Sequence, residues 1–133
     1  MAEDVKVVAA RKKQSDSDRA KNLLLTKTAR ETRVTIEVNG EPIELLYRAI
    51  SRRELDALRA KHPPTTKQRT DNPSAGVNSD TFNPALVAAC LVEPELTKAE
   101  VQELWDNGNW TQGELNHLYM GASDVCMEWF KTL

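Results

Sequence analysis

The stretch that decides the fold is Phe82 to Pro94, which reads Phe-Asn-Pro-Ala-Leu-Val-Ala-Ala-Cys-Leu-Val-Glu-Pro and contains the longest apolar run of the chain, Ala85 to Val92. The run is rich in alanine, and Pro84 suits the first position of a helix, where its missing N–H costs little. Asn83 can cap the exposed amides, and the closing proline ends the element. We therefore predict a central buried helix over residues 84–92, although such a run also fits a buried strand.

Three further helices are predicted from one repeated start signal, a Ser or Thr followed three residues later by Glu. The signal begins at Ser51, Thr97 and Thr111. In each such capping box, the two side chains and the two backbone amides are expected to bond reciprocally. The predicted helices cover residues 52–61, 98–106 and 112–131. The last of them carries an apolar stripe at helical spacing, typical of a core-facing helix: Leu115, Leu118, Tyr119, Ala122, Cys126, Trp129 and Leu133.

Residues 33–48 predict a β-hairpin. Apolar residues alternate with polar ones in both halves, and Asn39-Gly40 between them suits a two-residue turn with positive φ angles. No other strand is indicated. Residues 63–81 contain three of the six prolines and read as a long loop, which marks a partner contact or a hinge.

Residues 1–31 differ from the rest because they hold no aromatic residue, glycine or proline and are rich in Lys and Arg. We expect a basic, mobile arm with at most a transient helix near residues 17–28. Residues 32–133 are then one folded domain. The predicted fold class is mainly α with one N-terminal β-hairpin (α+β), a small four-helix domain packed on a two-stranded ribbon.

The pattern indicates no catalytic, cofactor or metal site. Cys90 and Cys126 lack metal-ligand spacing, His62 and His117 lie in different segments, and no glycine-rich phosphate loop occurs. No segment has the roughly 20 apolar residues that cross a bilayer. We therefore predict a protein of a reducing cytoplasm that is not an enzyme and needs no cofactor.

Binding through surface side chains is then the remaining kind of function. Large side chains are concentrated in the last third of the chain. Two of the tryptophans, Trp105 and Trp129, lie on helix stripes, where burial is expected. Met120, Met127 and Phe130 of the last helix lie off its apolar stripe. The predicted partner-binding residues are Met120, Met127, Phe130, Trp110 and Trp105. The hairpin edge and the off-stripe residues also predict a homo-oligomer.

Several segments together resemble the tail assembly chaperones of long-tailed, siphovirus-type bacteriophages. The resemblance covers about residues 34–133 and leaves out the basic arm. The segments that carry it are Tyr47–Glu54, His62–Thr65, Phe82–Leu86, Leu91–Pro94 and Trp105–Gly121.

This resemblance implies a non-virion protein of the host bacterial cytoplasm that binds the tape measure protein and keeps it soluble. It implies that the protein promotes polymerisation of the major tail tube protein around that ligand, and that a frameshifted longer form of the chain is a further partner. Two alternatives stay open: a structural virion component, such as a connector or tail-completion protein, and a nucleic-acid-binding regulator that uses the basic arm. The arm has no aromatic residue for stacking on bases, and no membrane partner is expected.

Overall fold

The computed structural model describes residues 2–127 of the chain, with side chains described from Lys13 onward. Its elements in order are α1 (Ala2–Leu25), β1 (Glu31–Val38), β2 (Glu41–Arg48), α2 (Arg52–Lys61), α3 (Thr66–Asp71), α4 (Ser79–Cys90), β3 (Leu91–Glu93), α5 (Lys98–Asp106) and α6 (Gln112–Met127). The α+β class is confirmed. The predicted four helices and two strands are too few, because the described residues form six helices and a three-stranded antiparallel sheet.

The hairpin prediction is confirmed. β1 and β2 pair in a register that closes with Val38 opposite Glu41, and Asn39 and Gly40 have φ angles of 53° and 81°. These positive angles match the twist of the flanking strands. On one face, Val34 lies opposite Leu45 and Ile36 opposite Ile43, which gives the sheet an apolar side for the helices.

The C-terminal end of the predicted central helix is wrong. α4 stops at Cys90, and Leu91–Glu93 forms β3, which pairs antiparallel with Leu46 and Tyr47 of β2. The proline at position 94 disfavours helical angles at the residue before it, and the free edge of β2 supplies a pairing partner. A three-residue strand is too short to show a period, so the sequence pattern did not reveal it.

The start of that helix is also wrong. α4 begins five residues earlier, at Ser79, so Pro84 lies inside the helix and Asn83 is not its cap. The cap is Asn78, whose Oδ1 accepts hydrogen bonds from the backbone N–H of Asp80 at 3.1 Å and from Nε2 of Gln68 at 2.9 Å. The proline removes one helical hydrogen bond, which burial of its ring in the core offsets.

The predicted loop over residues 63–81 contains α3. Its capping box is complete: the Thr65 N–H donates to Oε1 of Gln68 at 2.9 Å, and the Gln68 N–H donates to Oγ1 of Thr65 at 3.1 Å. This helix buries no residue, so it has no apolar stripe that a periodicity search would find.

The other capping signals set helix starts as predicted. α2 and α5 have the predicted bounds, and α6 begins at the predicted residue, while the predicted end at 131 lies outside the described residues. Thr97–Glu100 and Thr111–Glu114 make reciprocal bonds. The Ser51 box is only half formed, because the Glu54 carboxylate accepts from the Ser51 hydroxyl at 3.2 Å instead of from the Ser51 amide.

The capping boxes at Thr97 and Thr111 predict that the stability of the fold depends on pH. The backbone amides and hydroxyls of Thr97 and Thr111 hold the pKa of Glu100 and of Glu114 below the ordinary value. A lowered folded-state pKa means that the stabilisation is present above the ordinary pKa and is lost as the pH falls through the folded value. A carboxyl titration by NMR should therefore give both residues a pKa below that of an unfolded peptide. Values at or above the peptide value would contradict the capping geometry.

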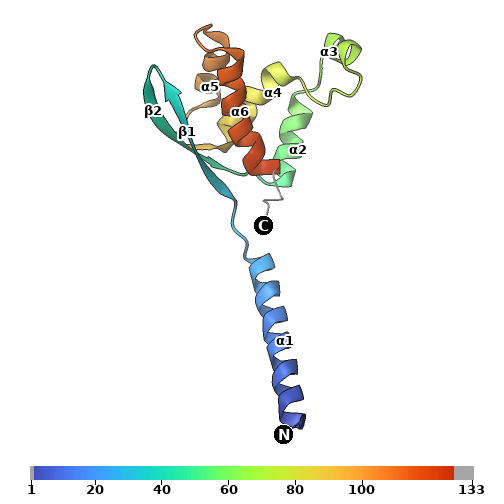
Figure 1. The fold of residues 1–133 in the computed structure, drawn as a ribbon. Coiled ribbons are helices and arrows are strands. Elements are labelled where there is room, and N and C mark those ends of the chain that lie inside the picture. The colour runs from blue at the N-terminus through green and yellow to red at the C-terminus, as the bar shows by residue number, and fades with distance from the viewer. Residues whose placement is uncertain (1, 128–133) are drawn as a thin grey trace.

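The basic arm forms α1, which projects away from the other elements (Figure 1). At 24 residues it is longer than the predicted transient helix near residues 17–28. The sequence supports the length, because the segment is rich in helix-forming Ala, Lys, Arg and Leu and has no Gly or Pro. The mobility of the arm remains a prediction.

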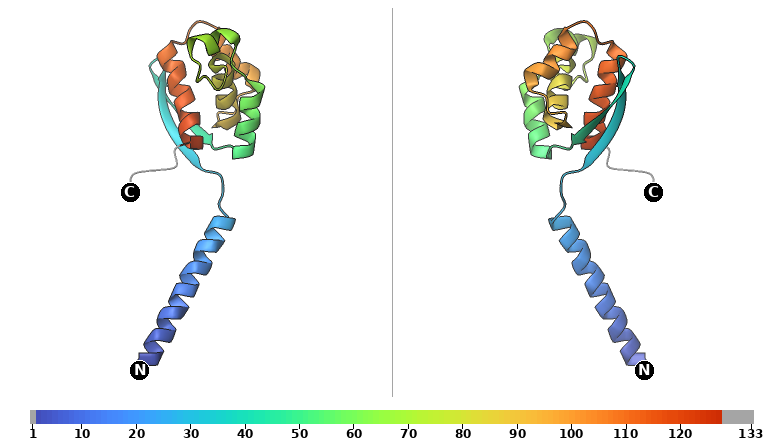
Figure 2. Two further views of the ribbon diagram at one scale, coloured as in Figure 1. Left: turned by 90° about the vertical axis from the view of Figure 1, so that its right-hand side faces the viewer. Right: turned by 90° about the vertical axis from the view of Figure 1, so that its left-hand side faces the viewer.

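The core centres on α4, as predicted. Figure 2 shows the helices of the domain grouped beside one side of the sheet. Phe82, Leu86 and Cys90 of α4 are buried against residues from β2, α5 and α6. Tyr47 of β2 is fully buried, and its hydroxyl donates to the Leu118 carbonyl of α6 at 3.0 Å. Loss of hydration raises the pKa of Tyr47 to about 12, so the phenol stays a donor at neutral pH.

Candidate functional site

The site is built on the side of α4 that faces away from the core. From Ala85 to Cys90 this helix is apolar all round, but neighbouring elements cover only part of that surface. Ala85, Leu86 and Val87 are buried, whereas Ala89 is exposed and Val92, just beyond the helix, is half-buried. An apolar helix face left open in this way offers a surface for another apolar partner.

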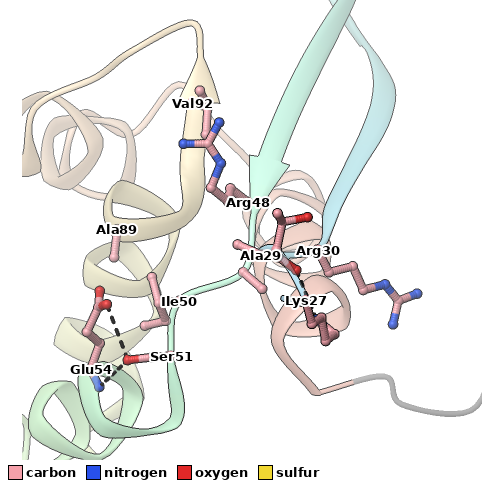
Figure 3. Close-up of a pocket in the computed structure, with 11 residues that line it drawn as sticks. Lys27, Ala29, Arg30, Arg48, Ile50, Ser51, Glu54, Ala89 and Val92 are labelled. Atoms are coloured by element: carbon pink, nitrogen blue, oxygen red, sulfur yellow. Dashed lines mark hydrogen bonds between the residues drawn. The ribbon is translucent and has the colours of Figure 1, made fainter. Parts of the chain in front are cut away.

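Two neighbouring cavities of about 560 and 240 Å³ lie along this open side. They share Ile50, Glu54 and Ala89, so they adjoin and form one depression, which we call the α2–α4 groove. Its smaller part lies between α2 and α4, and its larger part extends to residues 27–30 and the end of β2. Figure 3 shows its larger part, with Ala89 of α4 and Ile50 of the β2–α2 link on facing walls. The groove follows α2 from Glu54 to Lys61, about 10 Å along that helix at 1.5 Å per residue.

The floor and the rim of the α2–α4 groove differ in chemistry. The apolar lining residues, which we call its floor, are Ala49, Ile50, Ala57, Leu58, Ala89 and Val92. The positively charged lining residues, which we call its rim, are Lys27, Arg30, Arg48 and Lys61, and Arg48 is already paired with Glu31. Glu54 is the one carboxylate that lines the groove. The groove therefore favours an apolar ligand that also carries negative charge.

Local bonds hold the walls in place. The Ala49 N–H donates to the Arg30 carbonyl at 2.8 Å, which ties the segment after α1 to the end of β2. The Arg48 guanidinium bonds Glu31 across the hairpin at 2.9 Å. At the α2 side, Ser51 both caps the helix and bonds the Glu54 carboxylate (Figure 3). These bonds fix the walls of the groove, and the Glu31 carboxylate offsets the positive charge of Arg48.

The structure does not gather the predicted partner-binding residues into one patch. Met120 and Met127 are exposed by 52% and 40%, whereas Trp105 and Trp110 are half-buried against the core, and Phe130 lies outside the described residues, as does Trp129. Trp110 lies just before the start of α6 and Met127 at its end, and at 1.5 Å per residue that helix is about 24 Å long. Sδ of Met127 instead accepts a hydrogen bond from the guanidinium of Arg59 on α2 at 3.8 Å. A role for these residues in binding stays a prediction.

Sequence reasoning missed the α2–α4 groove. The usable signal was the apolar run itself, which is too evenly apolar for a helix with only one buried face. The sequence does not show which side of that helix remains uncovered.

The two cysteines meet in the fold, which their spacing did not indicate. The Sγ atoms of Cys90 and Cys126 are 3.5 Å apart, and both thiols are free. A hydrogen bond between them lowers the pKa of the partly exposed Cys126, and the same bond together with burial raises the pKa of Cys90. Within residues 2–127 no group of three His, Cys, Asp or Glu side chains is placed to hold a metal ion.

No helix among the described residues is long and apolar enough to cross a membrane. In the comparison with known protein families, a family model described as Phage XkdN-like tail assembly chaperone protein, TAC, matches residues 20–120. Neither the curated proteins nor the solved structures contain a significant match to the chain.

Proposed function

Because the chain belongs to the XkdN-like family of phage tail assembly chaperones, we propose that it binds the tape measure protein of its phage, keeps that protein soluble and promotes polymerisation of the tail tube around it. The matched region includes β1 to α5 and the first half of α6. It therefore includes every residue that lines the α2–α4 groove.

The observation that carries the proposal is the chemistry of the α2–α4 groove. Its apolar floor fits the apolar stripe of a helix, and its cationic rim fits acidic residues that flank such a stripe. A tape measure protein is a long, helix-rich chain whose apolar stripes would aggregate if left uncovered. We therefore place an acidic, amphipathic tape measure helix in the groove.

Binding of this kind needs no catalysis and no cofactor. The chain covers apolar helical segments in a fixed ratio, and the tube protein displaces it when the tail is assembled. We propose that this occurs in the host cytoplasm and that the chain is absent from the finished virion. Whether a frameshifted longer form takes part remains a prediction.

Co-expression with the tape measure protein tests this function. We expect the chain to raise the soluble fraction of the tape measure protein and to co-purify with it, because covered stripes no longer aggregate. An unchanged soluble fraction without co-purification would contradict the proposal. The chain at a fixed ratio in purified particles, measured by mass spectrometry, would instead make it a virion component.

A further inference from the structure

The outer edge of the sheet is open. The sheet order is β1-β2-β3, and within the described residues β1 pairs only with β2. β1 is eight residues long, has no proline and shows no register shift against β2. Natural edge strands avoid pairing through a proline, a bulge or charges. β1 carries only charges, and they are of both signs, so they can attract a second copy.

The hydrogen-bond pattern shows which residues of β1 face this edge. The bond from the Ala49 N–H to the Arg30 carbonyl marks residues 30 and 49 as a hydrogen-bonded pair. Bonded and non-bonded pairs alternate along an antiparallel ladder, so even-numbered residues of β1 bond to β2. The backbone groups of Arg33, Thr35 and Glu37 therefore point outward, away from β2.

We propose that two copies of this chain associate through β1, which pairs antiparallel with β1 of the second copy around a two-fold axis at Thr35. The two three-stranded sheets then form one continuous six-stranded sheet. The outward backbone groups of residues 33, 35 and 37 all find partners in this register, because residue 33 lies opposite residue 37.

The side chains select this register. Arg33 lies opposite Glu37 of the second copy, and the symmetry repeats this attractive pair; on the other face, Val34 lies opposite Ile36. An axis at Val34 would place Glu31 opposite Glu37, and an axis at Arg33 would place two arginines opposite each other. An axis at Ile36 would pair no charges. Registers that overlap less of β1 bury less of the edge.

The surface beside the open edge of β1 also favours a second copy of the chain as the partner. Val34 and Ile36 face the core side of the sheet, yet both remain half-exposed. A depression of about 290 Å³ lies next to Ile36, lined by Thr35, Ile36 and Glu37 of β1, by Trp110, and by Glu114 and His117 of α6. Pairing through β1 brings a second copy against this uncovered apolar surface. Arg33 already lies 3.3 Å from a Glu44 oxygen and 3.9 Å from a Glu93 oxygen, and its side chain is 59% exposed, so Glu37 of a second copy would compete with two weak, solvent-exposed pairs.

Reversing one charge tests the interface. In a Glu37→Arg variant, two arginines face each other at both ends of the pairing. We expect light scattering to give twice 14.9 kDa for the wild type and 14.9 kDa for this variant. The matched control is Glu41→Arg, which makes the same charge change on β2 and should keep the dimer.

Two further results distinguish this edge from any other dimer contact. A 1:1 mixture of the Glu37→Arg and Arg33→Glu variants pairs opposite charges at both ends and should restore the dimer. In the wild type, the amides of residues 33, 35 and 37 should exchange more slowly with solvent at high protein concentration. A monomeric wild type, or a dimer that Glu37→Arg leaves intact, would overturn the proposal.

Discussion

Replacing Gly121 with alanine is expected to lower the free energy of unfolding by about 2 kcal/mol, the usual cost of forcing extra volume into a packed core. Gly121 is buried on α6, against the ring of Tyr47. A Cβ atom at this position would lie 2.6 Å from Cε2 and 2.8 Å from Cζ of that ring. The ring is fully buried and its hydroxyl is bonded to α6, so it cannot move aside freely.

The same helix offers a matched control. At Gly113, near the start of α6, an added Cβ would meet only Oγ1 of Thr111, at 4.0 Å. Gly113→Ala should therefore be neutral or stabilise by up to about 1 kcal/mol, because alanine is the better helix former. Urea unfolding of both variants measures the contrast. Equal effects at the two glycines would show that the Tyr47 ring does not limit the space at position 121.

A double-mutant cycle separates the clash with the Tyr47 ring from other causes of destabilisation by Gly121→Ala. Tyr47→Leu removes the atoms that a Cβ at position 121 would meet, although it also removes the hydrogen bond to Leu118. In the Tyr47→Leu background, Gly121→Ala should lower the free energy of unfolding by clearly less than it does in the wild type. A cost that is the same in both backgrounds would mean no coupling between the two positions.

Local signals predicted the parts of this fold that local bonds determine. α2 and α5 have the predicted bounds because a Ser or Thr cap with Glu three residues on fixes a helix start. The hairpin was predictable because Asn39-Gly40 accepts positive φ angles. Each of these signals lies within a few residues of the structure it specifies.

The predicted ends of the central helix are wrong because contacts with segments far away in the chain determine them. Two asparagines precede the central run, and Asn78 is the cap because Gln68 and the backbone of His62 also bond it there. β3 exists because β2 offers it an edge. Neither contact can be read from the residues near the helix ends.

The site was harder to predict than the fold. Exposed methionines on α6 could be found by their position off the helix stripe, and Met120 and Met127 are indeed exposed. The α2–α4 groove required knowledge of which side of α4 the other elements leave open. The close approach of Gly121 to Tyr47 likewise joins residues that are far apart in the chain.

The largest functional effect is expected from Ala89→Glu. Ala89 lies on the apolar floor of the α2–α4 groove, is shared by both of its cavities and is exposed, so the substitution should leave the fold intact. A bound helix would bury the new carboxylate against apolar side chains, and it would also bring acidic residues close to it. We expect binding of the tape measure protein to weaken at least about tenfold, which corresponds to 1.4 kcal/mol.

The most direct test of the account is therefore the amount of tape measure protein that co-purifies with wild-type chain and with three glutamate variants. Ala89→Glu should lose it. Ala60→Glu, the same change at an exposed position of α2 outside the groove, should retain it. Met120→Glu tests the partner-binding role predicted for α6 from the sequence, and binding in the α2–α4 groove predicts that this variant also retains the partner. Retention by Ala89→Glu together with loss by Met120→Glu would contradict the account and place the partner on α6.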